Sequence, residues 1–485
     1  MKRRWMVPLI VIFVVSAIFA TSILVGLDNA KEQKGTRLNA GEKYSYSVIC
    51  ESFDWGPVIT KVVMCIDESL DEKTLFVDDF KVSCSREYNL DGSSPSKIDY
   101  RSEVETNQVG VTELYISDEK GNPLSTGRYL TFALEIKPDS VDNSPINYKN
   151  DYGKCSYVNI SYIIELLPNS RVRTTDGKEL SFFQTDKWGF VGLESFVPDG
   201  FDFNGKYKSK GVKLTYGTFT PKGSPSDDDK TPLIVFLHGY GEGGEDPSLV
   251  VMGNEVANLA SKEIQDYFGD TGAYLLIPQA PTSWMDYDGS GESCYWVKGS
   301  NGHSYYTEAL MGLIKKFVAQ HPDIDKNRIY LGGLSNGGYM TLNMLFNYPD
   351  YFAAAFPICE AYSDEWVTDE KIDEIHDIPI WFTHAKTDRT IVIYKIQDGV
   401  EEKAYNSYTN AAYRRLVQAG ATNVHYSLYD KVIDTSGRFF KEETQEPYEY
   451  NGHFSWIYVF NNECADTIDG EGVALFDWLS QQKKV

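Results

Sequence analysis

Apolar and polar positions follow two different patterns along the chain. Between about Lys43 and Phe182, apolar residues form short segments with turn residues between them, such as Glu119–Pro123 and Asp176-Gly177. Short strands divided by such turns are typical of an all-β sandwich of the immunoglobulin-like kind. The predicted strands are Tyr44–Cys50, Val58–Ile66, Thr74–Ser85, Val111–Ser117, Arg128–Lys137 and Tyr157–Leu166.

From about Leu214 onward, apolar strands alternate with segments of helical periodicity. Strands separated by helices of 10–15 residues predict a mostly parallel sheet with helices on both faces, the α/β-hydrolase type of architecture. The predicted strands are Leu233–Leu237, Tyr274–Ile277, Ile329–Gly332, Ala353–Ile358, Ile380–Thr383 and Val424–Tyr429, and the predicted helices are Glu255–Tyr267, Tyr305–Gln320 and one from Gly337.

The N-terminal segment has the pattern of an export signal. Lys2, Arg3 and Arg4 precede an apolar run from Met6 to Leu27, and a basic segment before an apolar one is the layout of a secretory signal peptide. About 20 apolar residues also suffice to cross a bilayer, so an uncleaved anchor is the alternative. We therefore expect a secreted or extracytoplasmic protein whose membrane contact, if any, is through this segment.

These patterns divide the chain into three parts. Residues 1–30 are the signal peptide or signal anchor, residues 38–186 the Ig-like sandwich, and residues 200–485 the α/β-hydrolase domain. The boundary is expected in the Gly- and Asp-rich stretch between about Asp186 and Lys210.

Composition excludes several classes of protein. The 485 residues are 42% hydrophobic and 24% charged, which rules out a disordered chain. Lys and Arg number 46 against 70 Asp and Glu, a net charge of −24, so we expect no nucleic acid partner.

The seven cysteines contain no C-x-x-C pair, which excludes zinc ribbons and thioredoxin-like chemistry. After export, Cys294 with Cys464, or pairs among the four sandwich cysteines, are candidates for disulfides. Cys359 is interpreted as a buried thiol.

A nucleophile motif lies in the second half of the chain. Gly333-Leu334-Ser335-Asn336-Gly337 follows a predicted strand and opens a predicted helix, the context of a nucleophile elbow. An ordinary turn serine is the alternative. In this context we identify Ser335 as the candidate nucleophile.

A serine nucleophile needs a base and a group that orients the base. In α/β-hydrolase chain order an acid follows the serine at the end of a later strand, and a histidine comes last. Asp388 follows the apolar segment Ile380–Thr383, and His453 lies in a loop before the final helix. His425 falls inside a predicted strand, where a packing role is expected. The predicted triad is Ser335, Asp388 and His453.

The oxyanion of the reaction needs two backbone donors. One is the N–H after the nucleophile, here that of Asn336. The other is expected in the glycine-rich loop that starts at His238, with Tyr240 preferred and Gly239 or Gly241 as alternatives. His238 is interpreted as a structural residue of this loop.

The mechanism requires no cofactor and no metal. The Asp286–Glu292 segment resembles a calcium loop only loosely, because the EF-hand register fails. Four aromatic residues are candidates either for a substrate pocket or for core packing: Trp284, Trp296, Tyr339 and Trp456.

Several segments together resemble a known group of enzymes. They are Pro232–Gly239, Pro278–Pro281 with Trp284, Arg328–Tyr339, Pro357–Cys359, and Gly452-His453 followed by Ser455-Trp456. The chain from about Leu214 resembles the bacterial esterases often called predicted peptidases, near the polyhydroxybutyrate-depolymerase-like and feruloyl-esterase groups. The stretch from Ile59 to Leu134 is similar to the Ig-like domain that precedes the hydrolase in some of them.

The resemblance implies the same triad and a serine esterase acting through an acyl-enzyme, with acyl or feruloyl esters of polysaccharides among the substrates. The sequence departs from the usual pattern at His384-Ala385, where His-Gly is common, at Asn336, where Met is frequent, and at Glu360, where Gly is common. These departures bear on pocket shape and substrate. The alternatives are a serine peptidase of the prolyl-oligopeptidase type and a non-catalytic binding protein on a hydrolase scaffold.

Overall fold

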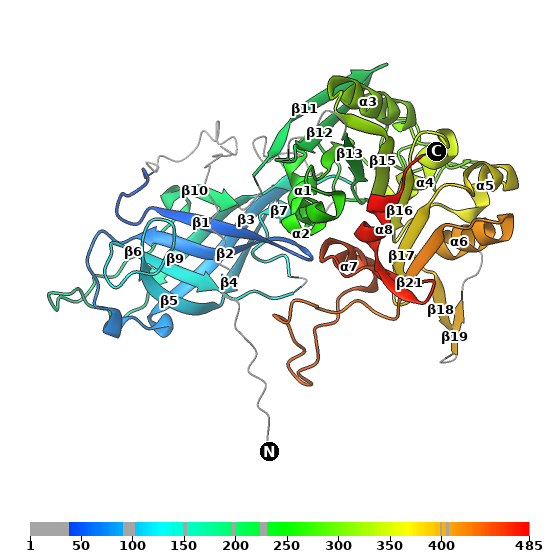
Figure 1. The fold of residues 1–485 in the computed structure, drawn as a ribbon. Coiled ribbons are helices and arrows are strands. Elements are labelled where there is room, and N and C mark those ends of the chain that lie inside the picture. Colours follow the sequence, from blue (N-terminus) through cyan, green and yellow to red (C-terminus); the bar gives the residue numbers. More distant parts are fainter. Residues whose placement is uncertain are drawn as a thin grey trace.

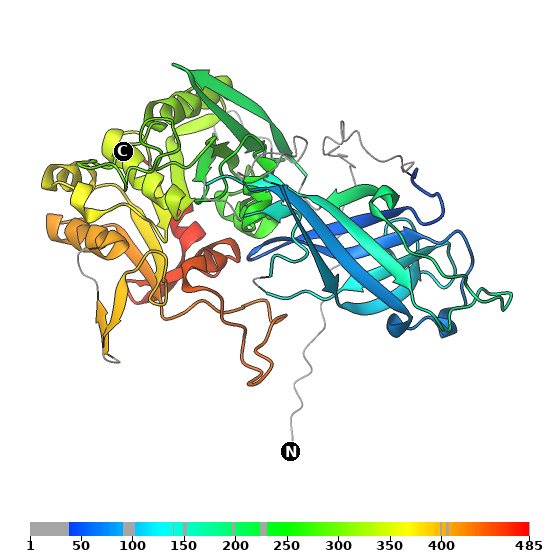
Figure 2. The same ribbon diagram turned by 180° about the vertical axis from the view of Figure 1, so that it is seen from behind.

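The protein, analysed as a computed structural model, has a β-sandwich domain and an α/β domain side by side (Figure 1, Figure 2). The structure describes residues 38–90, 102–138, 140–148, 153–195, 199–223, 230–397, 400–403 and 407–484. The predicted export segment, residues 1–30, lies outside these ranges. Within them, no helix is both long and apolar enough to cross a membrane.

The sandwich has two main sheets. The larger one has the order β10-β1-β2-β6-β5 and the smaller one the order β4-β3-β9. Aromatic side chains join them: the rings of Phe80 and Phe132 meet edge to face at 5.2 Å, and the Tyr162 N–H donates to the Tyr46 hydroxyl at 2.8 Å. The strands are β1 (Tyr46–Phe53), β2 (Gly56–Cys65), β3 (Phe80–Asn89), β4 (Ser102–Val109), β5 (Val111–Ser117), β6 (Tyr129–Leu134), β9 (Asn159–Leu166) and β10 (Phe190–Ser195), with a short β7–β8 pair (Ile146–Asn147, Ser156–Tyr157).

The predicted sandwich is confirmed, and its two main sheets contain two strands that were not predicted, β4 and β10. β4 was not predicted because most of its side chains are exposed and polar, which leaves little alternation in the sequence. β10 lies inside the stretch between Asp186 and Lys210 where we expected the boundary, and it pairs in parallel with β1. The sandwich therefore includes β10.

The second domain contains one eight-stranded sheet in the order β11-β12-β14-β13-β15-β16-β17-β20. Six neighbouring strands run parallel to one another, namely β14, β13, β15, β16, β17 and β20. β11 and β12 form an antiparallel edge. The predicted α/β-hydrolase fold with a mostly parallel sheet is confirmed. The strands are β11 (Phe201–Ser209), β12 (Val212–Phe219), β13 (Thr231–Leu237), β14 (Tyr274–Gln279), β15 (Ile324–Leu334), β16 (Ala354–Ile358), β17 (Ile380–Ala385) and β20 (Val424–Tyr429).

Helices cover both faces of this sheet. One apolar core lies between the sheet and α3 (Thr307–Gln320), α4 (Asn336–Asn347), α5 (Asp369–Ile375) and α6 (Tyr408–Ala419). The opposite core includes residues of α1 (Ser248–Gly253), α2 (Lys262–Gln265), α7 (Trp456–Phe460) and α8 (Leu475–Gln481). Two short hairpins, β18–β19 (Tyr394–Gln397, Val400–Lys403) and β21–β22 (Ala465–Ile468, Glu471–Ala474), lie outside the main sheet.

The predicted helix Glu255–Tyr267 is wrong as a continuous helix. The segment forms a short 3-10 turn, the four-residue α2 and a second 3-10 turn. Ser261 adopts an extended conformation, and its side chain caps α2 by accepting the Ile264 N–H. A serine that caps a new helix interrupts the one before it.

The two domains meet where the tip of the β1–β2 hairpin contacts the α/β domain. The Trp55 ring packs edge to face on Phe439 at 5.1 Å, and the Trp456 indole N–H donates to the Asp54 carbonyl at 3.3 Å. On the other side of the contact, Met252 of α1 belongs to the apolar core of the sandwich. The interface therefore combines apolar packing with hydrogen bonds to the hairpin tip.

All seven cysteines are free thiols in buried positions. The expected pairing of Cys294 with Cys464 is wrong, because the two lie in the cores on opposite faces of the sheet. The Cys294 thiol donates to the Tyr339 hydroxyl at 3.7 Å, and the Cys464 sulfur lies 3.2 Å from the Thr383 hydroxyl. The expected sandwich pairs are absent as well.

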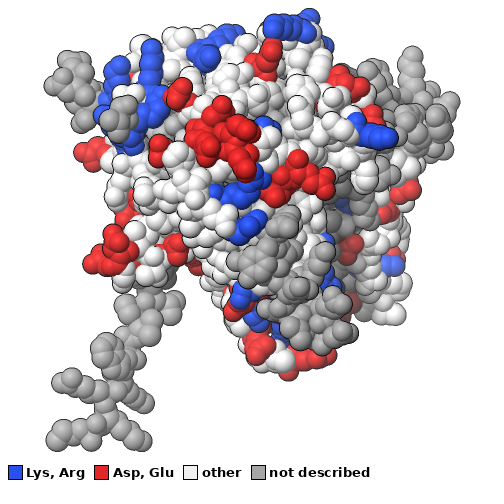
Figure 3. Space-filling model, turned by 90° about the vertical axis from the view of Figure 1, so that its right-hand side faces the viewer, with Lys and Arg blue, Asp and Glu red and all other residues white. Residues whose placement is uncertain are grey.

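The charged side chains do not segregate on the face shown in Figure 3, where Lys and Arg residues lie among Asp and Glu residues.

Candidate active site

The predicted nucleophile lies on a sharp turn between β15 and α4. Ser335 has φ 53° and ψ −111°, and its N–H donates to the Ile358 carbonyl at 2.8 Å. A positive φ is costly for a residue with a side chain. Because the hydrogen bond to the neighbouring strand β16 stabilises this turn, the serine is held where the strand ends.

Glycines are required around this turn because the backbone is tightly packed. A Cβ at Gly333 would lie 2.5 Å from the Gly337 carbonyl oxygen, and one at Gly337 would lie 2.0 Å from the Leu237 carbonyl oxygen. Both contacts are too short for any side chain. Gly333 is therefore required by the close approach of the first turn of α4 to the end of β15, and Gly337 by its close approach to β13.

His453 joins the serine to the acid. Its Nε2 lies 3.0 Å from the Ser335 Oγ, and its Nδ1 lies 2.7 Å from Oδ2 of Asp388. The Asn451 side chain caps the turn by accepting the His453 N–H at 3.0 Å. Ser335 and His453 are each 8% exposed and Asp388 is 2% exposed. The structure thus brings the three predicted triad residues together in one hydrogen-bonded line.

Backbone and imidazole donors hold the Asp388 carboxylate in place. Its Oδ1 accepts hydrogen bonds from the N–H groups of Thr390 and Ile391 at 2.7 and 2.8 Å. Its Oδ2 accepts a hydrogen bond from Nε2 of a second imidazole, that of His384, at 2.9 Å. Burial opposes ionisation, but the hydrogen bonds from His384 and His453 outweigh it and hold the pKa of Asp388 well below its usual range. Asp388 is therefore ionised.

His453 has the electrostatic environment of a base. Burial lowers its pKa, but the neighbouring Cys359 side chain and the Asp388 carboxylate outweigh burial and raise the pKa above its usual value. A raised pKa makes the imidazole a better proton acceptor.

The glycine-rich loop after β13 is held by a buried carboxylate. Glu242 accepts the Gly239 N–H at 2.7 Å and the Asn254 side-chain amide at 2.9 Å. Burial raises the pKa of Glu242 to about 7. Because its N–H is already bonded, Gly239 is excluded as the second oxyanion donor. Tyr240 and Gly241 stay the candidates beside Asn336.

A side-chain contact also fixes the start of α4. The Asn336 side-chain oxygen accepts the Trp284 N–H at 2.7 Å. This contact joins the residue after the nucleophile to the loop that follows β14. His238 supports the same region, since its Nε2 accepts the Ala280 N–H at 3.1 Å.

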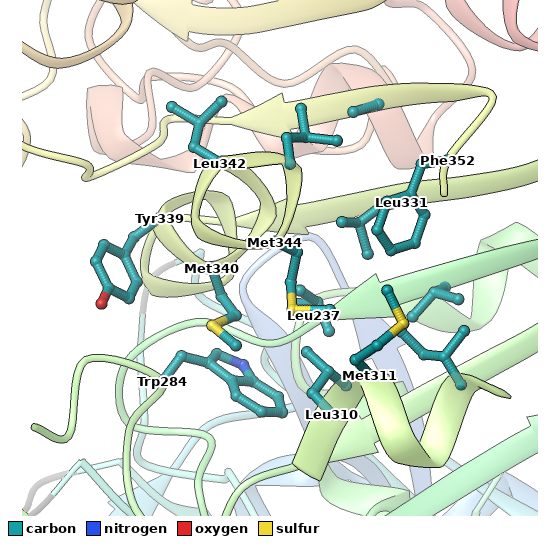
Figure 4. Close-up of a cluster of buried hydrophobic side chains, with 14 of the residues drawn as sticks. Leu237, Trp284, Leu310, Met311, Leu331, Tyr339, Met340, Leu342, Met344 and Phe352 are labelled. Carbon is teal, nitrogen blue, oxygen red and sulfur yellow. The ribbon is translucent and has the colours of Figure 1, made fainter. Parts of the chain in front are cut away.

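The four candidate pocket aromatics lie in different environments. Trp284 and Tyr339 are fully buried in the core beside α3 and α4 (Figure 4). Trp296 is 80% exposed. Trp456 is buried, and its ring meets that of His453 edge to face at 5.6 Å. Trp284 and Tyr339 therefore pack in the core. Of the four residues, Trp456 is the one whose ring contacts the triad.

Sequence reasoning missed His384, Glu242 and Cys359 as neighbours of the site. His384 precedes Asp388 by four residues, and Glu242 lies within the predicted oxyanion loop, so position alone was a signal for both. Cys359 and His453 are far apart in the chain, and only folding brings their side chains together. No group of three or more metal-ligating side chains gathers in the described ranges.

Family models match each domain separately. Residues 45–181 match the esterase Ig-like N-terminal domain, and residues 224–419 match the phospholipase/carboxylesterase family. The second match ends before His453.

Individual proteins are similar to this chain as well. The crystal structure of a thermostable esterase superposes with a TM-score of 0.61 and 25% identity, covering 91% of this chain and all of the other. The poly(3-hydroxyalkanoate) depolymerase C of Paucimonas lemoignei is 29% identical over 141 residues. That match spans 28% of this chain and 29% of the depolymerase.

Proposed function

We propose that this chain, whose α/β domain matches the phospholipase/carboxylesterase family and whose sandwich matches the esterase Ig-like N-terminal domain, is an exported serine hydrolase of carboxylic esters. The observation that carries the proposal is the hydrogen-bonded line from Ser335 through His453 to Asp388 at a nucleophile elbow. The full-length similarity to a thermostable esterase supports the same class of reaction.

In the first half of the reaction, the Ser335 Oγ attacks the ester carbonyl while Nε2 of His453 takes its proton. Asp388 accepts from Nδ1 and so keeps Nε2 free to act as the base. The negative charge on the carbonyl oxygen is bound by the N–H of Asn336 and by a second N–H from the loop at Tyr240. His453 then gives the proton to the departing alcohol, leaving an acyl-enzyme on Ser335.

In the second half, water replaces the alcohol. His453 removes a proton from the water as it attacks the acyl carbonyl, and the proton returns to the Ser335 Oγ as the acid is released. No cofactor or metal takes part in either half.

The substrate class and the place of action extend this proposal. The basic and apolar pattern of residues 1–30 supports export, with the membrane contacted only through that segment if it is not cleaved. A small ester or an acylated polysaccharide is the proposed substrate, and the net charge of −24 speaks against nucleic acid as a partner.

The test combines a covalent probe with a substrate comparison. A fluorophosphonate should label the wild-type protein on Ser335, identified by mass spectrometry of the labelled peptide, and Ser335→Ala should not be labelled. Acetyl, longer acyl and feruloyl esters are then compared with peptide anilides of matched acyl groups. Ester turnover that depends on Ser335 supports the proposal, faster anilide cleavage indicates a peptidase, and no labelling indicates a binding protein.

A further inference from the structure

The antiparallel edge of the large sheet carries a group of exposed lysines. β11 and β12 form a two-stranded ribbon at the end of the sheet beside α3 (Figure 1). Lys208 of β11 lies directly opposite Lys213 of β12, and Lys206 precedes Lys208 by two residues on the same face of the ribbon. All three side chains are exposed. Opposite residues lie about 5 Å apart and residues two apart on a strand about 7 Å, so the three lysines share one small surface, the lysine face.

The lysine face has no countercharge of its own. Lys210, at the turn between the two strands, pairs with Glu308 of α3 at 2.7 Å. Among the described residues, by contrast, no acidic side chain forms an ion pair with Lys206, Lys208 or Lys213. Like charges placed directly opposite each other destabilise an antiparallel pair. In a chain with a net charge of −24, three unpaired cations at one place are therefore not a consequence of composition.

Protection of the sheet edge explains only part of this arrangement. Lysines on an edge strand discourage pairing with another chain, and β11 is the edge strand of its sheet. Lys213, however, lies on β12, which is paired on both sides, with β11 and with β14. The other face of the ribbon is already covered, since Leu214 is buried in the core beside α3 and Tyr207 packs against that core. The lysine face is the open face of the ribbon.

Two hydrogen bonds connect the lysine face to the loop that is proposed to bind the oxyanion. Thr215 lies opposite Lys206 on the same face, and its hydroxyl donates to Oε1 of Gln279 at 3.0 Å. The Nε2 of Gln279 in turn donates to the Glu242 carbonyl oxygen at 2.9 Å. The lysine face therefore borders this loop.

The pairing register places the lysine face at the catalytic end of the sheet. Gln279 is the last residue of β14 and pairs with Thr215, so Lys208 and Lys213 lie beyond the carboxyl end of the parallel strands. Ser335 follows β15 at the same end. Four strand spacings of about 4.8 Å, roughly 19 Å in all, separate β11 from β15. A polymer bound at Ser335 spans that distance, whereas a small ester does not.

We propose that the lysine face binds the carboxylates of an acidic polysaccharide, so that the polymer whose acyl esters are cleaved at Ser335 is a polyuronate. The inference rests on the proposed function of Ser335. An ammonium group binds carboxylates as a point charge without a fixed geometry, which allows the polymer to bind in many registers. The attraction acts over about 8–10 Å at ordinary ionic strength, so acidic residues elsewhere on the protein do not cancel it.

Other polyanions fit this surface less well. The acidic remainder of the chain repels a nucleic acid, whose backbone makes many more charged contacts than three lysines provide. A flat anionic membrane would also meet the exposed carboxylates of Asp202 on β11 and Glu308 on α3. A single polysaccharide chain is narrow enough to follow the lysine face and avoid both.

The experiment compares four full-length proteins. They are the wild type, a neutral triple variant of the lysine face, an arginine triple variant at the same positions, and a control with the same loss of charge on the sandwich. The neutral variant is Lys206→Gln/Lys208→Gln/Lys213→Gln, and the control is Lys73→Gln/Lys81→Gln/Lys178→Gln. The control lysines are exposed, and none of them has an ion pair among the described residues.

Binding and turnover are measured separately. Isothermal titration calorimetry at low and high salt measures binding of polygalacturonate, of neutral dextran and of phosphatidylglycerol vesicles. Steady-state kinetics are recorded with acetylated polygalacturonate and with 4-nitrophenyl acetate, which is too small to reach the lysine face. Circular dichroism and thermal unfolding report whether each protein folds.

The wild type should bind polygalacturonate at low salt, more weakly at high salt, and should not bind dextran. The neutral triple variant should have a KM for the acetylated polymer about tenfold higher, because three exposed charge pairs are lost. Its kcat for the polymer and its kinetics with 4-nitrophenyl acetate should not change. The arginine variant and the control should both match the wild type.

An unchanged polymer affinity in the neutral variant, or an equal loss in the control, overturns the inference. Lysine-dependent binding to the vesicles without binding to polygalacturonate overturns it as well, and assigns the face to a membrane. If the neutral variant does not fold, Lys208→Gln/Lys213→Gln replaces it, and if acetyl is not the acyl group cleaved, the calorimetry decides. Failure of the proposed function is seen separately, as hydrolysis of 4-nitrophenyl acetate that survives Ser335→Ala.

Discussion

Gly243 of the glycine-rich loop donates its N–H to the carbonyl oxygen of Gly153 in the sandwich domain at 3.0 Å. The Cys155 N–H returns to the Gly243 carbonyl at 2.9 Å, so the two segments form a short parallel β-bridge. The Tyr240 ring lies over Gly153, where a Cβ would come within 2.9 Å of it. The sandwich therefore braces the loop that is proposed to bind the oxyanion, although it supplies none of the proposed catalytic groups.

This bridge predicts that Gly243→Ala lowers turnover. A Cβ there would lie 1.9 Å from the Thr282 carbonyl oxygen and 2.7 Å from that of Gly153, so the loop must move. Because a displaced oxyanion donor costs about 100-fold in kcat, we expect a loss of that order with little change in KM. Gly192→Ala is the control, since its Cβ meets nothing within 4 Å. Equal kinetics for the two variants would show that the bridge does not position the loop.

The triad predicts that the effects of its mutations on turnover are strongly non-additive. Ser335→Ala, His453→Ala and Asp388→Asn should each lower kcat by roughly 10⁴-fold or more, and the double variants should be little worse than the worst single variant, because the residues act as a unit. Steady-state kinetics with circular dichroism measure this. Near-normal turnover by a folded Ser335→Ala protein would contradict the proposed nucleophile.

The pH dependence follows from the state of His453. A general base must be neutral, and the pKa of His453 lies above its usual value of 6.5. We therefore expect kcat/KM to be low at pH 5 and to rise through a midpoint above 6.5. A kcat/KM that falls between pH 5 and 7 would mean that His453 is not the base.

Glu242 predicts a pH-dependent stability. Its pKa rises from 4.5 to about 7 on burial, so the folded state holds the proton more tightly than the unfolded state. The contribution of Glu242 to the free energy of unfolding is therefore complete below 4.5 and is lost as pH rises through about 7, a loss of about 3 kcal/mol. Urea unfolding measures the free energy of unfolding at pH 4.5 and 7.5. Its decrease between the two pH values should be smaller for Glu242→Gln than for the wild type. The exposed Glu365→Gln is the control, and an equal decrease in all three proteins would contradict the assignment.

The buried thiols predict that the protein does not depend on disulfides. Ellman's reagent should titrate seven thiols in the denatured protein without prior reduction, and dithiothreitol should leave Tm unchanged. Fewer than seven thiols, or a Tm lowered by the reductant, would show that pairs form after export.

The amino-acid sequence by itself determined the two kinds of domain and the order of the chemistry along the chain. Leu233–Leu237 and Tyr274–Ile277 were predicted to within two residues of β13 and β14 because the continuous burial of these strands leaves a local apolar run. The positions of Ser335, Asp388 and His453 were predicted because a nucleophile elbow and strand-end loops are local features with a known chain order. Their geometry agrees with that order, since Ser335 and Asp388 follow β15 and β17, two parallel strands on either side of β16 whose carboxyl ends lie at the same edge of the sheet.

Only the tertiary structure decided which side chains support these groups. Thr409 and His384 come from α6 and β17, and Gly153 comes from the other domain, so no spacing in the sequence connects them to the site. The same holds for Cys294 and Cys464, which composition allowed to pair and which the sheet separates. Local periodicity records whether a residue is buried, whereas the direction of a buried hydrogen bond depends on partners that only folding brings within 3 Å of each other.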